Sequence, residues 1–221
     1  ALARPPYMPQ LGLSGGWTAI TDFLSELDFE NFVFLTSDDL YWKAYLSSLQ
    51  IAVIATFATL LVGYPMAYGM ARAPKEWQAT LLMLVILPFW TSFLIRVYSL
   101  MGILGNEGPL NQLLLWTGLI STPLQILNTK IAVYIGIVYT YLPFMILPIY
   151  AALEKMDESL LEAAEDLGCS RLEAFWLVTF PLSRGGIVAG CFLVFIPTIG
   201  EFVIPSLLGG SGTLMIGKVL W

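Results

Sequence analysis

The sequence predicts an all-α membrane protein, a polytopic bundle of helices. Of its 221 residues, 57% are hydrophobic and only 12% are charged, whereas soluble domains carry about 25% charged residues. Several uncharged apolar segments reach the length of about 20 residues that a helix needs to cross a bilayer. Prolines recur inside these segments. They would break soluble helices, but neighbouring helices in a membrane satisfy the carbonyls that proline leaves free.

Composition also excludes several kinds of function. The chain has no histidine, so no catalytic triad and no histidine-based acid–base or metal site is available. The net charge of −6 opposes binding to nucleic acid. Cys169 lies in a polar loop and Cys191 inside an apolar segment, so we expect no disulfide between them. We therefore expect no catalytic residue and no metal site.

The elements follow from the apolar runs in order. Residues 1–43 are polar and acidic, and residues 102–130 are expected to form a turn with a short interfacial helix. A fifth span in 102–130 is the alternative, although Pro123, Gln125 and Asn128 interrupt its pattern. The four predicted spans cover about residues 44–71, 77–101, 131–153 and 185–208.

The distribution of basic residues predicts the orientation. Arg72 and Lys75 follow the first span, and Lys155, Arg171 and Arg184 lie between the third and fourth. Because loops rich in Lys and Arg stay in the cytoplasm, residues 154–184 are predicted to be cytoplasmic and the acidic segment 1–43 external.

The loop 154–184 contains the signals of two short helices. Ser159 with Glu162 and Ser170 with Glu173 each fit a capping box. Gly168 between them suits a left-handed turn after the first helix, and Pro181 is expected to end or kink the second. The small side chains of Ala163 and Ala164 let another surface approach closely. An amphipathic helix lying on the membrane is the alternative, but such helices favour basic polar faces and this one is acidic.

The same loop resembles the EAA loop of ABC importer permeases. The resemblance rests on the spacing of Glu162, Ala163 and Ala164, then Gly168, then Val178 and Pro181. The family often has Ile and Leu where this chain has Val178 and Phe180. Segments 87–98, 132–139 and 200–205 are similar to permease subunits of putrescine/spermidine importers, and the similarity covers nearly all 221 residues.

The resemblance implies a type I ABC importer permease fold, MetI-like, in the bacterial cytoplasmic (inner) membrane. It implies that the EAA helix couples to a cytoplasmic ABC ATPase dimer. It also implies a second permease subunit and a periplasmic or extracellular polyamine-binding protein, with membrane lipid around the spans. Relative to that family, a first span before Ala1 and a last span after Trp221 are missing. The chain carries no glycine-rich phosphate loop ending in Gly-Lys, so we expect a non-enzyme that binds no cofactor, with ATP hydrolysed by the partner subunit.

Glu201 is the residue that sequence reasoning places on a substrate pathway. It is the only carboxylate in the fourth apolar segment, and a carboxylate at membrane depth suggests a function. A structural pair with Arg96 is the alternative. Other cargoes, namely an inorganic anion, iron or a sugar, remain the rival function, and a channel or membrane enzyme fits the sequence less well. The aromatic candidates for contact with a polyamine are Trp90, Tyr98, Tyr141 and Phe195.

Overall fold

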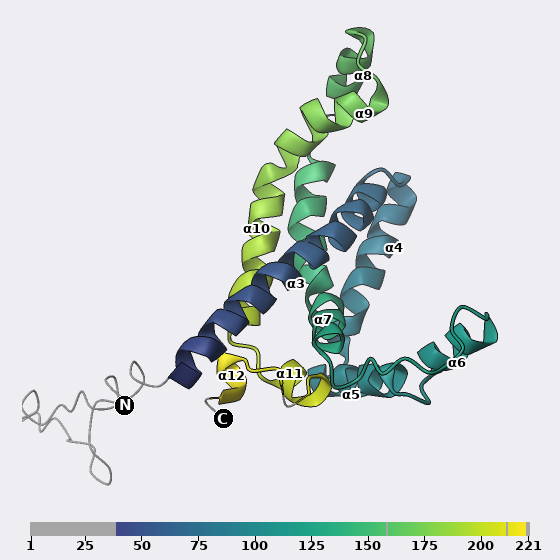
Figure 1. The fold of residues 1–221 in the computed structure, drawn as a ribbon. Coiled ribbons are helices and arrows are strands. Elements are labelled where there is room, and N and C mark those ends of the chain that lie inside the picture. The colour runs from purple at the N-terminus through teal and green to yellow at the C-terminus, as the bar shows by residue number, and fades with distance from the viewer. Residues whose placement is uncertain (1–38, 158, 211, 220–221) are drawn as a thin grey trace, which may run out of the picture. The chain divides into compact units, whose positions relative to one another are not determined.

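The computed structural model describes residues 39–219 except 158 and 211, and within that range every regular element is helical (Figure 1). The described residues from Leu46 onward form one compact unit, and the contacts discussed below lie within it. Residues 1–38 of the predicted external segment lie outside the described residues. The longer elements are α3 (Asp39–Ala71), α4 (Lys75–Ile86), η1 (Leu87–Trp90), α5 (Phe93–Leu104), α6 (Pro109–Trp116), α7 (Lys130–Glu154), α8 (Ser159–Asp166) and α10 (Phe180–Ile199). The shorter ones are α9 (Arg171–Ala174), the π-helix η2 (Phe175–Thr179), α11 (Val203–Leu208) and α12 (Ile216–Val219).

Three described helical stretches are long and apolar enough to cross a membrane: Leu40–Ala71, Lys130–Glu154 and Arg171–Ile199. The first and second agree with the predicted spans at 44–71 and 131–153. A fourth crossing exists only if the bent pair formed by Lys75–Trp90 and Phe93–Trp116 is counted as one span. The all-helical fold with several spans is therefore confirmed, and two of the predicted spans need correction.

The predicted span at 77–101 is not one straight helix. Its two halves, Lys75–Trp90 and Phe93–Trp116, are bent by 95°. Pro88 lacks an N–H, so the α-helix tightens there into the 3₁₀ helix η1. Thr91 and Ser92 then adopt extended backbone. The Thr91 hydroxyl donates to the carbonyl of Pro88 at 2.7 Å and closes the end of the helix.

The predicted span at 185–208 also has different limits. Residues 171–199 form one 29-residue helical stretch, which ends at Ile199, and α11 is a separate short helix. Pro181 does not end the helix, because the chain passes through the π-helix η2 just before it. There the Phe180 N–H donates to the carbonyl of Phe175, the longer i→i+5 bond that lets a helix absorb an irregularity.

The core lies where α7 packs against α10. A Cβ at Gly186 would lie 2.5 Å from the carbonyl oxygen of Pro148, and one at Gly190 would lie 2.9 Å from Sδ of Met145. Met145 is fully buried and also faces Gly63 of α3, where a Cβ would lie 3.0 Å from its Cγ. Glycines four residues apart let membrane helices approach closely, so Gly186 and Gly190 set the distance between α7 and α10.

The end of α3 near Ala71 packs against the start of the long helical stretch. The Tyr64 hydroxyl lies 3.0 Å from Oγ of Ser183, and the rings of Tyr64 and Tyr68 both meet Phe175 edge-on, at 5.8 and 5.6 Å between centroids. These contacts hold η2 and the beginning of α10 against α3.

Residues 105–129 contain only one helix, the eight-residue α6, so a fifth span is not formed and the short-helix expectation is met. Asn111 is 1% exposed and fixes this segment. Its side-chain amide nitrogen donates to the carbonyls of Gly105 and Leu124, and its oxygen accepts from the N–H of Leu124 at 2.9 Å.

Replacing Gly186 by leucine should destabilise the protein by several kcal/mol, because the added atoms meet backbone that cannot move aside. Gly185→Leu is the matched control, since a Cβ at Gly185 has no atom within 4 Å. We expect the thermal unfolding midpoint of the detergent-purified protein to fall for the first variant and to stay near wild type for the second. Equal midpoints for the two would contradict the close α7–α10 contact.

Candidate functional site

Residues 157–174 except 158, here called the elbow, form the helix–turn–helix that the sequence predicts between two spans. α8 begins at Ser159, whose N–H donates to the side chain of Asp157 at 3.0 Å. The N–H of Leu160 lies 3.3 Å from the carbonyl of Asp157. Ser159 therefore lies in the first turn and is itself capped, so the predicted capping box of Ser159 with Glu162 is wrong. The bonds from Ser159, first its N–H and then its hydroxyl, hold the pKa of Asp157 below its usual value.

The turn at Gly168 is confirmed. Its φ is +88°, in the left-handed region where a side chain is strained. The N–H of Gly168 donates to the carbonyl of Glu165, and the N–H of Cys169 to that of Ala164. Together these two bonds make a Schellman motif, which satisfies carbonyls at the end of α8.

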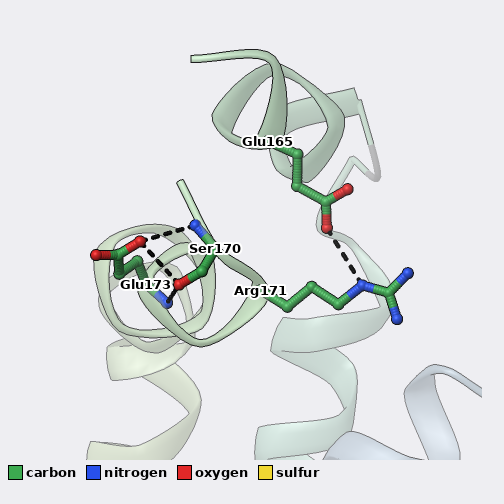
Figure 2. A network of polar contacts seen from close by, with 4 residues as sticks. All are labelled: Glu165, Ser170, Arg171 and Glu173. Carbon is green, nitrogen blue, oxygen red and sulfur yellow. Dashed lines mark hydrogen bonds and ion pairs between the residues drawn. The ribbon is translucent and has the colours of Figure 1, made fainter. Parts of the chain in front are cut away.

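The second capping box is also confirmed, as Figure 2 shows. Oε2 of Glu173 accepts from the N–H of Ser170 at 2.7 Å, and Oγ of Ser170 accepts from the N–H of Glu173 at 3.4 Å. Figure 2 also shows Arg171 reaching Glu165 of α8, with 3.7 Å between Nε and Oε1. Both side chains of that pair are largely in solvent, so it contributes little stability.

The apolar side chains of the elbow differ in exposure. Of the EAA residues, Ala164 is buried, while Glu162 and Ala163 are exposed; Val178 and Pro181 are half-buried. Leu167 is 87% exposed and Leu172 70% exposed, one on each side of the Gly168 turn. Sequence reasoning named neither Leu167 nor Leu172 as a candidate site residue, and the signal that could have found them is their position on either side of the Gly168 turn.

Glu201 lies in the break between α10 and α11 and is 9% exposed. Its Oε2 accepts from the hydroxyl of Tyr141 on α7 at 2.7 Å. Its Oε1 accepts from the N–H groups of Val203 and Ile204 at 3.0 and 3.4 Å, at the start of α11. The carboxylate is therefore outside the helix to which sequence reasoning assigned it.

Arg96 does not meet Glu201 as the alternative interpretation expected. Its guanidinium lies over the rings of Phe89 and Phe93, at 5.2 and 5.9 Å from their centroids. A row of aromatic rings separates the two charges: Phe89 meets Phe144 edge-on at 5.0 Å, and Phe144 lies 6.0 Å from Tyr141.

The four aromatic candidates do not form one cluster. Tyr141 is buried beside Glu201, whereas Trp90 is 83% exposed on η1 and Tyr98 is exposed on α5. Phe195 lies in an apolar cavity of about 450 Å³ between α3 and α10, lined also by Phe57, Cys191 and Phe192. Of the four, the structure places Tyr141 alone in contact with Glu201.

Comparison with known proteins agrees with this architecture. Residues 60–221 match the model of a family described as binding-protein-dependent transport system inner membrane component. The chain is 44% identical over 224 aligned residues to a spermidine/putrescine transport system permease protein of Escherichia coli, covering 93% of this chain and 82% of the relative. A molybdenum transport system permease protein of Azotobacter vinelandii is 30% identical, covering 74% of this chain and 71% of the relative. A solved bacterial ABC transporter that imports alginate shares the fold, with a TM-score of 0.61, 18% identity, and coverage of 88% of this chain and 62% of its own.

Acidification should loosen the start of α8. Because the pKa of Asp157 is lowered in the folded protein, the stability that its bonds contribute is present above the unfolded pKa of about 3.9. That contribution is lost as the pH falls through the lower folded value. We expect amide exchange of Ser159 and Leu160, corrected for its intrinsic pH dependence, to speed up over that window. Asp157→Ala should abolish the transition, and an unchanged transition in this variant would contradict the assignment.

Proposed function

Because the chain belongs to the family of binding-protein-dependent transport system inner membrane components, we propose that it is a permease subunit of an ATP-driven polyamine importer. It is a multi-pass protein of the inner membrane. The observation that carries the choice of cargo is the 44% identity, over 93% of the chain, to a relative named for spermidine and putrescine transport. The relative named for molybdenum transport shares only 30%.

We further propose the partners that complete such a transporter. A second permease subunit forms the other half of the pathway, and a binding protein delivers the polyamine from outside. A pair of cytoplasmic ATPase subunits hydrolyses ATP, while this chain binds no nucleotide and performs no catalysis. This division of labour is supported by the family's description as a component of a binding-protein-dependent system.

The elbow is the proposed contact with the ATPase, on the cytoplasmic side of the membrane. Its exposed leucines supply apolar area, and the small Ala163 allows close approach. The stretch 171–199 is continuous through η2 into α10, so a displacement of the elbow moves α10 directly. Nucleotide binding shifts the equilibrium between the inward- and outward-facing states only to the extent that the nucleotide binds one state more tightly than the other.

The exposed aromatic side chains remain proposed pathway residues. Trp90 and Tyr98 present their rings on the surface of this subunit, where a second permease subunit would complete a channel. A ring facing an ammonium group contributes about 0.5–2 kcal/mol, depending on desolvation. Phe195 faces an apolar cavity, which suits helix or lipid packing better than a cation.

Uptake measurements test the cargo. The chain is expressed together with its proposed partner subunits in a strain that lacks polyamine import. It should restore ATP-dependent accumulation of labelled putrescine or spermidine. Molybdate uptake in the same cells serves as the control, because that cargo belongs to the 30%-identical relative. Molybdate accumulation without polyamine accumulation would refute the proposed cargo while leaving the family unchanged.

Enlarging Ala163 tests the coupling contact. Ala163→Trp places a large ring on an exposed position of α8, so it should leave folding intact and prevent the ATPase from seating. We expect polyamine uptake and substrate-stimulated ATP hydrolysis to fall by at least tenfold, or about 1.4 kcal/mol, with normal amounts of protein in the membrane. Ala163→Ser is the matched control and should transport normally. Normal uptake by the tryptophan variant would rule out close docking at this face.

A further inference from the structure

Three residues, Gly200, Glu201 and Phe202, form the α10–α11 junction, where the long helical stretch stops and the chain turns into α11. The glutamate at its centre is nearly buried, and both of its carboxylate oxygens already have protein partners. A residue whose role is to bind a passing cation would instead present at least one oxygen to an open cavity. The contacts of Glu201 therefore need an explanation from within the fold.

One side of the carboxylate completes a helix start. The first N–H groups of a helix have no partner within it, and Phe202 supplies no side-chain bond at this position. Oε1 of Glu201 accepts from two of these groups, on Val203 and Ile204. A carboxylate at this end also interacts favourably with the positive pole of the helix dipole. Glu201 therefore fixes the direction in which α11 leaves the junction.

The other side ties the junction to α7. Tyr141 is buried in α7, next to the ring of Phe144, and its hydroxyl donates to Oε2 at 2.7 Å. Because this oxygen and this hydroxyl are both removed from water, losing either partner leaves the other unsatisfied, which is costly in a buried site. The pair therefore joins α7 and α11 at one point.

Backbone contacts show that other helices depend on the same point. A Cβ at Gly217 of α12 would lie 2.6 Å from the carbonyl oxygen of Gly200 and 2.9 Å from that of Glu201. The N–H of Ile216, next to it, donates to Oγ of Ser48 on α3 at 2.7 Å. A shift of the junction would thus disturb the packing of α12 and its bond to α3.

We propose that Glu201 is a positioning residue: with Tyr141, it fixes the α10–α11 junction, and it acts on transport through geometry rather than by contacting the charge of the cargo. This proposal rests on the proposed polyamine function only for its transport readout. It replaces a pathway role with one in which a nearly buried carboxylate links the end of the long helical stretch to α7 and α11, with α12 packed against the same junction.

The two roles predict opposite effects of conservative variants. In Glu201→Gln the amide oxygen still accepts from the start of α11, and the amide nitrogen donates to Tyr141, so a positioning residue is largely replaced while a charge contact is lost. Tyr141→Phe removes the bond to α7 and leaves the carboxylate in place. If Glu201 is a positioning residue, Tyr141→Phe should impair the transporter more than Glu201→Gln does. If Glu201 instead contacts the charge of the cargo, Glu201→Gln should impair it more.

The experiment uses the assembled transporter, purified with its partner subunits. Thermal unfolding is measured without polyamine for Glu201→Gln, Tyr141→Phe and the double variant, and the KM of putrescine uptake is measured in membranes. We expect Tyr141→Phe to lower the midpoint by about 2 °C or more, and Glu201→Gln to lower it by less. The double variant should fall about as far as Tyr141→Phe alone, because the bond to α7 is already lost in that single variant. Glu201→Gln should leave KM within about threefold of wild type.

Tyr139→Phe on the same helix is the matched control and should unfold at the wild-type midpoint, because Tyr139 is 43% exposed. A wild-type midpoint for Tyr141→Phe, or a larger rise in KM for Glu201→Gln, would overturn the proposal. The unfolding measurement contains no polyamine, so it decides the positioning role even if putrescine is not the cargo. An absence of putrescine uptake by the wild-type transporter would instead count against the proposed function.

Discussion

The close contact of α7 with α10 sets the position of the other helices in this protein. In a membrane there is no hydrophobic force between helices, so their association depends on packing and on backbone approach. Gly186 and Gly190 supply that approach, and Met145 fills the space between α10, α7 and α3. The elbow lies at one end of the helical stretch held in this way, and the α10–α11 junction at the other.

This arrangement explains why straight and broken helices occur together. The stretch 171–199 is uninterrupted because η2 absorbs the missing N–H of Pro181, and α3 supports its beginning through Tyr64 and Tyr68. The two breaks, at residues 91–92 and 200–202, lie on opposite ends of one aromatic row that runs through α7. Continuous helices that meet at defined breaks allow a subunit to transmit a displacement from one end to the other.

Sequence reasoning succeeded where the signal is local. Uncharged runs of sufficient length located α3 and α7. The Gly168 turn and the Ser170 cap could be predicted because their hydrogen bonds join residues no more than five positions apart. It failed where distant packing decides. Pro143 and Pro148 lie inside the continuous α7, whereas Pro88 begins a bend of 95°, and composition does not distinguish these cases. The partner of Glu201 was missed because it depends on the register of α7 against α10, which the glycine contact fixes.

The orientation of the elbow is tested most directly by cysteine labelling. Cys169 and Cys191 are first replaced by serine, and Leu172→Cys then offers one exposed thiol on the elbow. We predict that a membrane-impermeant maleimide will label this thiol in inside-out vesicles and not in intact cells stripped of their outer membrane. We also predict that a short cross-linker will join it to the ATPase subunit. Labelling of this thiol in the intact stripped cells would contradict a cytoplasmic position of the elbow.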